Sequence, residues 1–206
     1  MNSEAMLNKA GLATAVVLAG GRSRRMGTDK ALLLLDGMTL IEHAVEKFRA
    51  SIAFDEILIS ANRPEAYAFL GLPVVPDRFP GDGPLAGMQA CLETAKNEYV
   101  SFVPCDAPRI PPGLPAWLLK KAQGHDAACP VFRERPEPLL SCVRKTALPA
   151  ISNALSAGER RAADVFARLD TAYIDLAGLT DVFGEPGEYL VNANDPETFR
   201  RVSASV

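Results

Sequence analysis

Two adjacent glycines followed by a basic segment form the part of the chain whose residue types most clearly suggest chemistry. Gly20 and Gly21 follow the apolar run 15–19, and residues 22–30 then supply three arginines and Lys30. Paired glycines let the backbone approach an anion closely and point N–H groups toward it, while the cations neutralise its charge. The pattern predicts a loop that binds a nucleoside triphosphate. The alternative is a strand-to-helix turn that carries solvated basic residues.

The spacing of this loop differs from the two commonest nucleotide-binding motifs. A dinucleotide site has G-x-G-x-x-G, and a P-loop has G-x-x-x-x-G-K-[ST]. Here the order is G-G-x5-G-x-x-K, with Lys30 beyond the last glycine, which disfavours NAD binding and P-loop chemistry. Lys30 is suited to bind phosphate as a compact charge and Arg25 as a planar fork. Arg22 and Arg24 either contact phosphate or are solvated.

Asp106 follows the apolar run 100–103 and is placed at the carboxyl end of a predicted strand. In open α/β sheets, ligands bind at that edge. Mg²⁺ is usually held by one or two carboxylates together with phosphate oxygens and water. Asp106 is therefore predicted to hold Mg²⁺ beside the triphosphate, and capping of the following turn is the alternative.

Asp77 ends another short apolar segment, residues 72–76, and is expected to open onto the same edge of the sheet. An aspartate before Phe79-Pro80-Gly81 also suits a simple turn, so both interpretations stay open. The segment 81–87 (GDGPLAG) has the pattern of a helix start when it is taken alone.

Short apolar runs alternate with helical patterns, an order that predicts an α/β fold with a mostly parallel sheet and helices on both faces. The capping-box sequence 39–42 and the dipeptide Gly83-Pro84 mark two helix starts. Prolines break the second half into short elements, which we expect to form loops around a site. The predicted strands cover residues 15–19, 56–60, 72–76, 99–104, 126–132, 139–143 and 190–191, with 126–132 and 139–143 paired. The predicted helices start near residues 39 and 83, cover 163–169, and start again at Asp195-Pro196.

Length and composition favour one globular domain. The chain has 206 residues, 48% of them hydrophobic, which is enough for a single core. We expect residues 1–11 to form a flexible tail and residues 12–206 to form the domain. The net charge is −3 and the basic residues gather near residues 22–30, so nucleic acid is not the expected partner. No segment approaches the roughly 20 apolar residues of a membrane span, so no membrane partner is expected either.

The cysteines give no sign of a metal site. The four cysteines form no C-x-x-C pair, and the chain has only two histidines that could complete a zinc site with them. We therefore expect reduced, mostly buried thiols. The apolar segment 12–19 is followed by glycines and arginines rather than by a cleavage site, which favours a cytoplasmic protein over a secreted one.

Together these segments resemble a known family. Residues 18–30 (LAGGRSRRMGTDK) match the signature LAGGxSxRMGxDK of nucleotidyltransferases that make nucleoside diphosphate conjugates, and are most similar to the molybdenum cofactor guanylyltransferases. The resemblance continues, in order, through GPLAG (83–87), PCDAPRIP (104–111) and NAN (192–194). It implies a Rossmann-like three-layer nucleotidyltransferase fold, with a nucleotide-binding N-terminal half and an acceptor-binding C-terminal half.

The resemblance also implies a reaction and its residues. GMP would pass from GTP to the terminal phosphate of molybdopterin, which would already carry molybdenum, with release of pyrophosphate and with Mg²⁺ as cofactor. The implied partners are GTP and the molybdopterin cofactor, with a cofactor-delivery protein or a molybdoenzyme beside them. The implied catalytic residues are Arg25, Lys30 and Asp106, and Asp106 binds the metal. The implied nucleotide-binding residues are Leu18, Ala19, Gly20, Gly21, Lys30, Asp77, Gly83, Pro84, Leu85 and Asp106, and the implied acceptor-binding residues are Arg160, Arg161, Asn192 and Asn194.

Two departures from the family pattern leave contacts open. Ser60 stands where some relatives carry an asparagine, with Asn62 shortly after it, and residues 137–140 lack a histidine often found there. Solvation explains Arg160 and Arg161 nearly as well as phosphate binding does, and local turn chemistry explains Asn194.

Three other functions remain as alternatives. GTP is favoured over CTP only because LAGG and GPLAG are similar to the guanylyl branch, whereas the cytidylyl branch tends to carry LAAG. The alternatives are cytidylyl transfer to molybdopterin, nucleotidyl transfer to a sugar phosphate or another phosphorylated acceptor, and a non-catalytic GTP-binding module.

Overall fold

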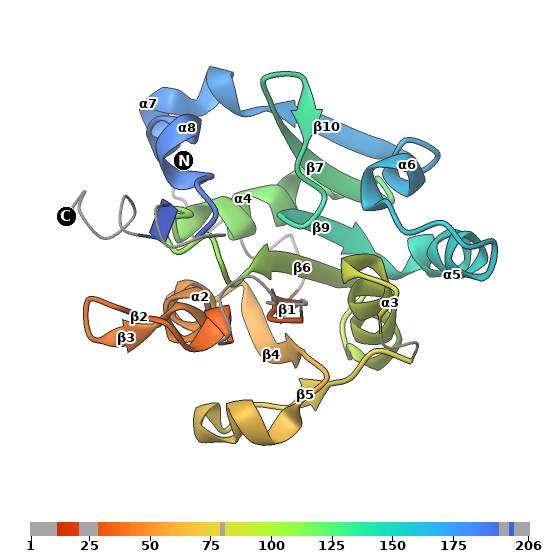
Figure 1. Ribbon diagram of the computed structural model, residues 1–206. Coiled ribbons are helices and arrows are strands. Elements are labelled where there is room, and N and C mark those ends of the chain that lie inside the picture. The colour runs from red at the N-terminus through yellow and green to blue at the C-terminus, as the bar shows by residue number, and fades with distance from the viewer. Residues whose placement is uncertain (1–11, 21–28, 79–80, 194–197, 200–206) are drawn as a thin grey trace.

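The computed structural model describes residues 12–20, 29–78, 81–193 and 198–199. Most of the strands formed by these residues join one sheet in the order β10-β7-β9-β6-β1-β4-β5, with β8 paired to β7 (Figure 1). The strands are β1 (Ala13–Leu18), β2 (Leu34–Leu35), β3 (Met38–Thr39), β4 (Phe54–Ser60), β5 (Val74–Val75), β6 (Tyr99–Pro104), β7 (Ala127–Phe132), β8 (Arg135–Pro136), β9 (Ser141–Arg144) and β10 (Thr171–Asp175). The α-helices are α2 (Leu40–Arg49), α3 (Pro84–Thr94), α4 (Gly113–Lys121), α5 (Leu148–Ser156), α6 (Ala162–Phe166), α7 (Thr180–Phe183) and α8 (Pro186–Tyr189).

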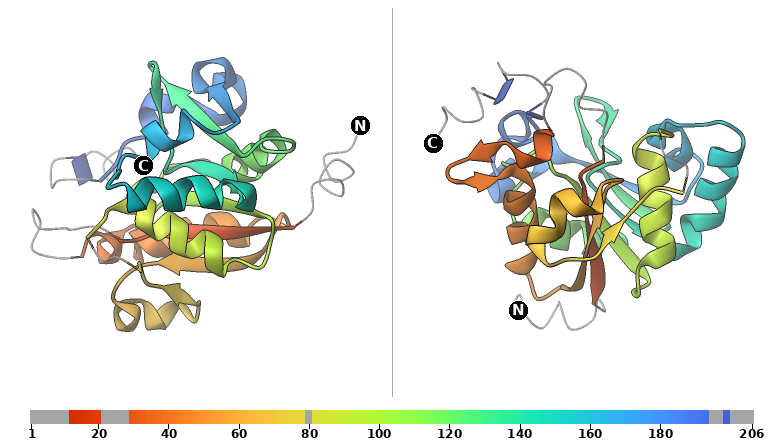
Figure 2. Two further views of the ribbon diagram at one scale, coloured as in Figure 1. Left: turned by 90° about the vertical axis from the view of Figure 1, so that its right-hand side faces the viewer. Right: turned by 60° about the horizontal axis from the view of Figure 1, so that its bottom comes forward.

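The central strand β1 is buried on both faces. Ala15 and Val17 pack into a core shared with α2 and α4, whereas Val16 and Leu18 pack into a second core shared with α3 and α5. Successive side chains of a strand point to opposite faces, so a continuous apolar run suits a strand that is covered on both sides. Figure 2 shows α2 on one side of the sheet and α3 and α5 on the other. The predicted α/β fold with helices on both faces is confirmed.

The sheet is mostly parallel, as predicted, and β1 lies at its topological switch point. β1 pairs in parallel with β4 on one side and with β6 on the other, and the register places Leu18 beside both Ser60 and Pro104. Among the described strands of this sheet, the β8 and β9 pairings are antiparallel, and they include the predicted pairing of β7 with β9; β2 and β3 form a separate antiparallel pair. Ligands bind in open α/β sheets where the strand order reverses. A binding site is therefore expected at the carboxyl ends of β1, β4 and β6.

The predicted capping box starts α2. The Thr39 hydroxyl accepts a hydrogen bond from the Glu42 N–H at 3.4 Å, and Glu42 Oε2 accepts one from the Thr39 N–H at 2.7 Å. These contacts satisfy N–H groups that the helix itself leaves without partners. Ile41, Val45 and Phe48 then face the core on one side of the helix.

Thr39→Ala is expected to lower the free energy of unfolding by about 1 kcal/mol, since it removes one half of the capping box. Thr39→Ser keeps the hydroxyl and serves as the matched control. Chemical denaturation of the three proteins measures the effect. Equal stability of Thr39→Ala and the parent chain would show that the cap contributes nothing.

The predicted strand 190–191 is wrong. Glu185-Pro186 starts the short helix α8, and Leu190 ends it with φ −83° and ψ 8°. Val191 is apolar because it packs against a small cluster around Leu35 and Leu40, not because it belongs to the sheet. The predicted helix starting at Asp195 and the predicted tail 1–11 lie outside the described residues.

The second half is more regular than its prolines suggested. Pro115 lies in the first turn of α4, and α5 and α8 each carry a proline at their start. The first turn needs no N–H from these positions, so proline is tolerated there. The prolines therefore hid the helices α4 and α5. The strand β10, which contains no proline, was not predicted either, and the helix predicted over 163–169 begins earlier and ends at Phe166.

All four cysteines are free and buried, as expected. Burial raises the pKa of the Cys91 thiol to about 12 and that of the Cys129 thiol to about 12. None of the helices that the structure describes combines the length and the apolar character needed to cross a membrane.

Candidate active site

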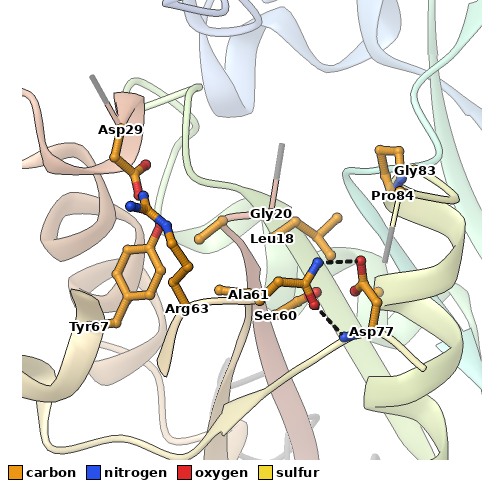
Figure 3. Close-up of a pocket in the computed structure, with 14 residues that line it drawn as sticks. Leu18, Gly20, Asp29, Ser60, Ala61, Arg63, Tyr67, Asp77, Gly83 and Pro84 are labelled. Carbon is orange, nitrogen blue, oxygen red and sulfur yellow. Dashed lines mark hydrogen bonds and ion pairs between the residues drawn. The ribbon is translucent and has the colours of Figure 1, made fainter. Parts of the chain in front are cut away.

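A cavity of about 530 Å³ opens at the carboxyl ends of β1, β4 and β5. This volume is within the range of sites for small molecules. Figure 3 shows Asp29, Arg63 and Tyr67 on one side of it, Asp77, Gly83 and Pro84 on the other, and the ends of β1 and β4 between them. The lining residues are Leu18, Ala19, Gly20, Asp29, Ser60, Ala61, Asn62, Arg63, Tyr67, Asp77, Gly81, Gly83, Pro84 and Gly87. Most of the predicted nucleotide-binding residues in the described part of the chain thus surround one cavity.

Lys30 and Asp106 meet beside this cavity. Lys30 Nζ lies 3.1 Å from Asp106 Oδ2, and the two side chains are 21% and 20% exposed. Lys30 begins a short 3₁₀ helix, Lys30–Leu32, and Asp106 follows the end of β6. The sequence predicted phosphate-binding and metal-binding roles for these two residues separately, and the fold brings them into contact.

Asp29, the residue before Lys30, is held by contacts with three other residues. Asp29 accepts a hydrogen bond from the Tyr67 hydroxyl at 2.8 Å, pairs with Arg63, and caps the 3₁₀ helix by accepting from the Ala31 N–H at 3.2 Å. Burial is the main reason that the pKa of Tyr67 is raised, so its hydroxyl stays a donor to Asp29. No local pattern in the sequence identifies Arg63 or Tyr67, because their partner is more than 30 residues away along the chain.

Asn62 and Asp77 hold one another in the wall of the cavity. Asn62 Nδ2 donates to Asp77 Oδ2 at 2.8 Å, and the Asp77 N–H donates to Asn62 Oδ1 at 2.8 Å. Burial raises the pKa of the Asp77 carboxyl, the Asn62 amide opposes this shift, and the charge of Asp82 adds to it. Asn62 lies just beyond the end of a predicted strand, as Gly20 does, and that position is the signal that could have identified it.

Gly87 lets the first turns of α3 lie against the ends of β4 and β5. A Cβ at this position would lie 2.4 Å from Ser60 Oγ and 3.1 Å from Asp77 Oδ1. Gly83, the N-cap of the same helix, has φ 80°, which favours glycine. Ser60, the residue that departs from the family pattern, therefore packs beneath the cavity against Gly87.

Gly87→Ala is expected to raise KM for the nucleotide about tenfold, because the new methyl group must displace Ser60 and Asp77 from the cavity wall. The double variant Gly87→Ala/Ser60→Ala removes the closest contact and should recover part of the loss. Nucleotide titrations at saturating acceptor measure both. An unchanged KM in the single variant would contradict the expected clash.

The predicted acceptor-binding residues lie in two places. Ala193 N–H donates to the Asp106 carbonyl at 2.7 Å. Asn192, which precedes Ala193 and is exposed, is therefore brought near Asp106 by the fold. Arg160 instead pairs with Asp82 at 2.9 Å and donates to the Leu155 and Glu159 carbonyls. The Arg161 side chain is 82% exposed, with Asp164 at 3.8 Å.

Not every predicted nucleotide-binding residue in the described ranges lines the cavity: Lys30 and Asp106 lie beside it, and Leu85 lies beneath it. The Leu85 side chain is fully buried in the core under α3 rather than among the residues that line the cavity. Gly21, Arg25 and Asn194 lie outside the described residues.

The donor groups suit an ion that shares its ligands with a substrate. Within the described ranges, no group of three or more His, Cys, Asp or Glu side chains is placed to hold a metal. Mg²⁺ needs no such cage, because one or two carboxylates with phosphate oxygens and water suffice. The Asp106 carboxylate at the edge of the sheet fits that requirement.

Comparison with known proteins agrees with this geometry. Residues 15–172 match a family model described as the MobA-like NTP transferase domain. The chain is 36% identical to a probable molybdenum cofactor guanylyltransferase of Carboxydothermus hydrogenoformans, covering 92% of this chain and 94% of that one. It is also 36% identical to a molybdenum cofactor guanylyltransferase of Shewanella sp. (strain MR-4), covering 93% and 95%.

Solved structures give the same fold. Molybdopterin-guanine dinucleotide biosynthesis protein A from Archaeoglobus fulgidus superposes with a TM-score of 0.78 at 25% identity, covering 92% of this chain and 96% of that one. Rv0371c from Mycobacterium tuberculosis, solved as a complex with manganese, superposes with a TM-score of 0.67 at 15% identity, covering 95% and 100%.

Proposed function

The chain belongs to the MobA-like NTP transferase family, and from this premise we propose that it transfers GMP from GTP to the terminal phosphate of molybdopterin. The products are molybdopterin guanine dinucleotide and pyrophosphate. As a family member the chain is a nucleotidyltransferase. The observation that carries the proposal from the structure is the contact of Lys30 with Asp106 beside a cavity at the switch point of the sheet.

Positioning and charge supply the chemistry in this proposal. An oxygen of the acceptor's terminal phosphate attacks the α-phosphorus of GTP, the bond between the α-phosphorus and the bridging oxygen breaks, and pyrophosphate leaves. A phosphate monoester is already anionic near neutral pH, so no general base is needed. Lys30, Arg25 and the backbone N–H groups of Gly20 and Gly21 neutralise the phosphates and hold them in line.

A divalent ion completes the proposed site, with Asp106 as its protein ligand, and we propose Mg²⁺. When bound, such an ion neutralises charge on the triphosphate oxygens and orients them. Asp77, Gly83 and Pro84 are proposed to contact the nucleotide together with Leu18 and Ala19, whereas Leu85 is buried in the core and supports the start of α3 from beneath.

Guanine fits the proposal because the cavity wall is built from bare backbone at several points. Gly20 and Gly83 line the cavity without side chains, which leaves room for a purine whose edge the backbone is proposed to contact.

The acceptor is proposed to bind on the other side of Asp106. Asn192 lies beside Ala193, whose N–H holds the Asp106 carbonyl. Arg160, Arg161 and Asn194 are proposed to contribute further contacts to the anionic acceptor.

We propose that residues 12–206 act as one domain after a tail of residues 1–11, with the N-terminal half binding nucleotide and the C-terminal half binding acceptor. The four buried free thiols suit the cytoplasm as its compartment, and a cofactor-delivery protein or a molybdoenzyme is the proposed further partner.

One assay tests the proposed function. The purified protein is incubated with Mg²⁺, each nucleoside triphosphate in turn, and either molybdopterin or one of several sugar phosphates, and pyrophosphate release is measured. We expect release only with GTP and molybdopterin. Equal or faster release with CTP would overturn the base assignment, release with a sugar phosphate would overturn the acceptor, and GTP binding without release would leave a binding module.

A further inference from the structure

Lys47 is a buried lysine that lies outside the residues given a role above. It projects from the last part of α2, and only 7% of the residue is exposed. Its ammonium group donates to the Pro108 carbonyl and to the His43 carbonyl, the latter at 3.3 Å. Burial lowers the pKa of the Lys47 ammonium to about 8. A buried cation is costly to keep, so its contacts need an explanation.

Pro108 belongs to the turn that presents Asp106. The backbone of this turn is held at other points: Cys105 N–H donates to the Leu18 carbonyl at 3.1 Å, and the Asp106 carbonyl accepts from Ala193 N–H at 2.7 Å. Ala107 and Ile110 are buried, so the turn is packed into the protein rather than laid over its surface. A carbonyl in such surroundings needs a donor. Lys47 supplies it to Pro108 from across the core.

We propose that Lys47 is a positioning residue for the metal site. Its ammonium group holds the Pro108 carbonyl in place. Asp106 lies between the end of β6 and Pro108, so this contact fixes the turn on the C-terminal side of Asp106 and orients the carboxylate toward the divalent ion. The inference rests on the proposed function in one respect, namely that Asp106 holds the ion. A small displacement of a catalytic group lowers the rate strongly, so a contact two residues away from Asp106 is close enough to matter.

The test is Lys47→Met, which keeps most of the side-chain volume and removes the donor. We expect kcat to fall about tenfold and KM for GTP to change less than about twofold. We also expect Mn²⁺, titrated calorimetrically with a non-hydrolysable GTP analogue present, to bind about tenfold more weakly. The melting temperature should move by less than about 4 °C, since the lost hydrogen bonds are offset by the removal of a buried charge.

Lys145→Met is the matched control. Lys145 also donates its ammonium hydrogen to a backbone carbonyl, that of Ala95, but at the opposite edge of the sheet, near the start of β6. A purely structural role for such a contact would give both variants the same behaviour. We expect Lys145→Met to keep the parent's kcat and Mn²⁺ affinity.

Lys47→Gln keeps the test decisive if Lys47→Met does not fold. Its shorter side chain retains an N–H donor near the His43 carbonyl but does not reach Pro108, so it should lose kcat and Mn²⁺ affinity as well. The proposal is overturned if a folded Lys47 variant binds Mn²⁺ as the parent does, or if neither variant folds. Failure of the proposed function would instead appear as absence of pyrophosphate release by the parent chain, and would leave the Mn²⁺ comparison intact.

Discussion

Replacing Lys30 with alanine is expected to lower kcat by about 10²- to 10³-fold while the protein stays folded. The charge of Lys30 lies 3.1 Å from Asp106, at the position where a triphosphate and its ion would meet. A positioned cation stabilises the charge that develops on the phosphates, and its loss is felt in the transition state more than in the ground state. Pyrophosphate release at saturating GTP and acceptor measures the effect.

Lys121→Ala is the control for this experiment. Lys121 lies at the end of α4 over the Trp117 ring, 4.9 Å from the ring centroid, and has no part in the proposed site. It should leave kcat unchanged. A folded Lys30→Ala variant with the turnover of the parent would remove Lys30 from the mechanism.

Replacing Asp106 with asparagine is expected to lower kcat by about 10²-fold or more and to weaken binding of the divalent ion. The amide keeps the shape of the side chain and can still accept a hydrogen bond from Lys30, so the loss reports the missing negative charge rather than a disturbed turn. Removal of divalent ions from the parent chain with a chelator should abolish transfer, and added Mg²⁺ should restore it.

Two comparisons make this prediction specific. Asp170→Asn, at an exposed carboxylate paired with His125, should keep the parent's activity and its Mg²⁺ dependence. If Asp106→Asn showed the parent's Mg²⁺ dependence, the metal would have to be bound by other residues.

The sequence predicted the parts of the fold that depend on local pattern. The apolar run in β1 is long and unbroken because the strand is buried on both faces. The capping box of α2 is recognisable from the sequence because its two residues are three positions apart. Proline was misleading because its effect depends on position. In the sequence Pro115 suggests the end of a helix, yet it lies in the first turn of α4, where the missing N–H is not needed.

The candidate site was predictable where its residues follow predicted strands. Gly20, Asp77 and Asp106 each lie at a strand end, and parallel strands bring their carboxyl ends to one edge. Tyr67 and Arg63 were not predictable, because their role is to hold Asp29 from a distant segment, which only the folded chain reveals. The same holds for Lys47, whose contact with Pro108 joins α2 to the turn after β6.

The contact between Asp82 and Arg160 shows a further limit of prediction from sequence. The resemblance implies an acceptor-binding role for Arg160, which stays a prediction, and the structure shows in addition that Arg160 pairs with Asp82 in the segment before α3 that lines the cavity. The side chain of its neighbour Arg161 is exposed, and its ion-pair partner is Asp164 in α6. Adjacent residues of one motif thus have partners in different segments of the folded chain, and the motif alone does not indicate which.

A crystal structure of the protein with Mg²⁺ and a non-hydrolysable GTP analogue would show whether the nucleotide and the ion bind at the carboxyl ends of β1, β4 and β6. We expect the phosphates to lie against Gly20 and Lys30, the ion to bind the Asp106 carboxylate, and guanine to occupy the cavity beside Gly83 and Gly87. Density for the nucleotide at any other place on the molecule, with Asp106 still paired to Lys30 and without an ion, would contradict this expectation.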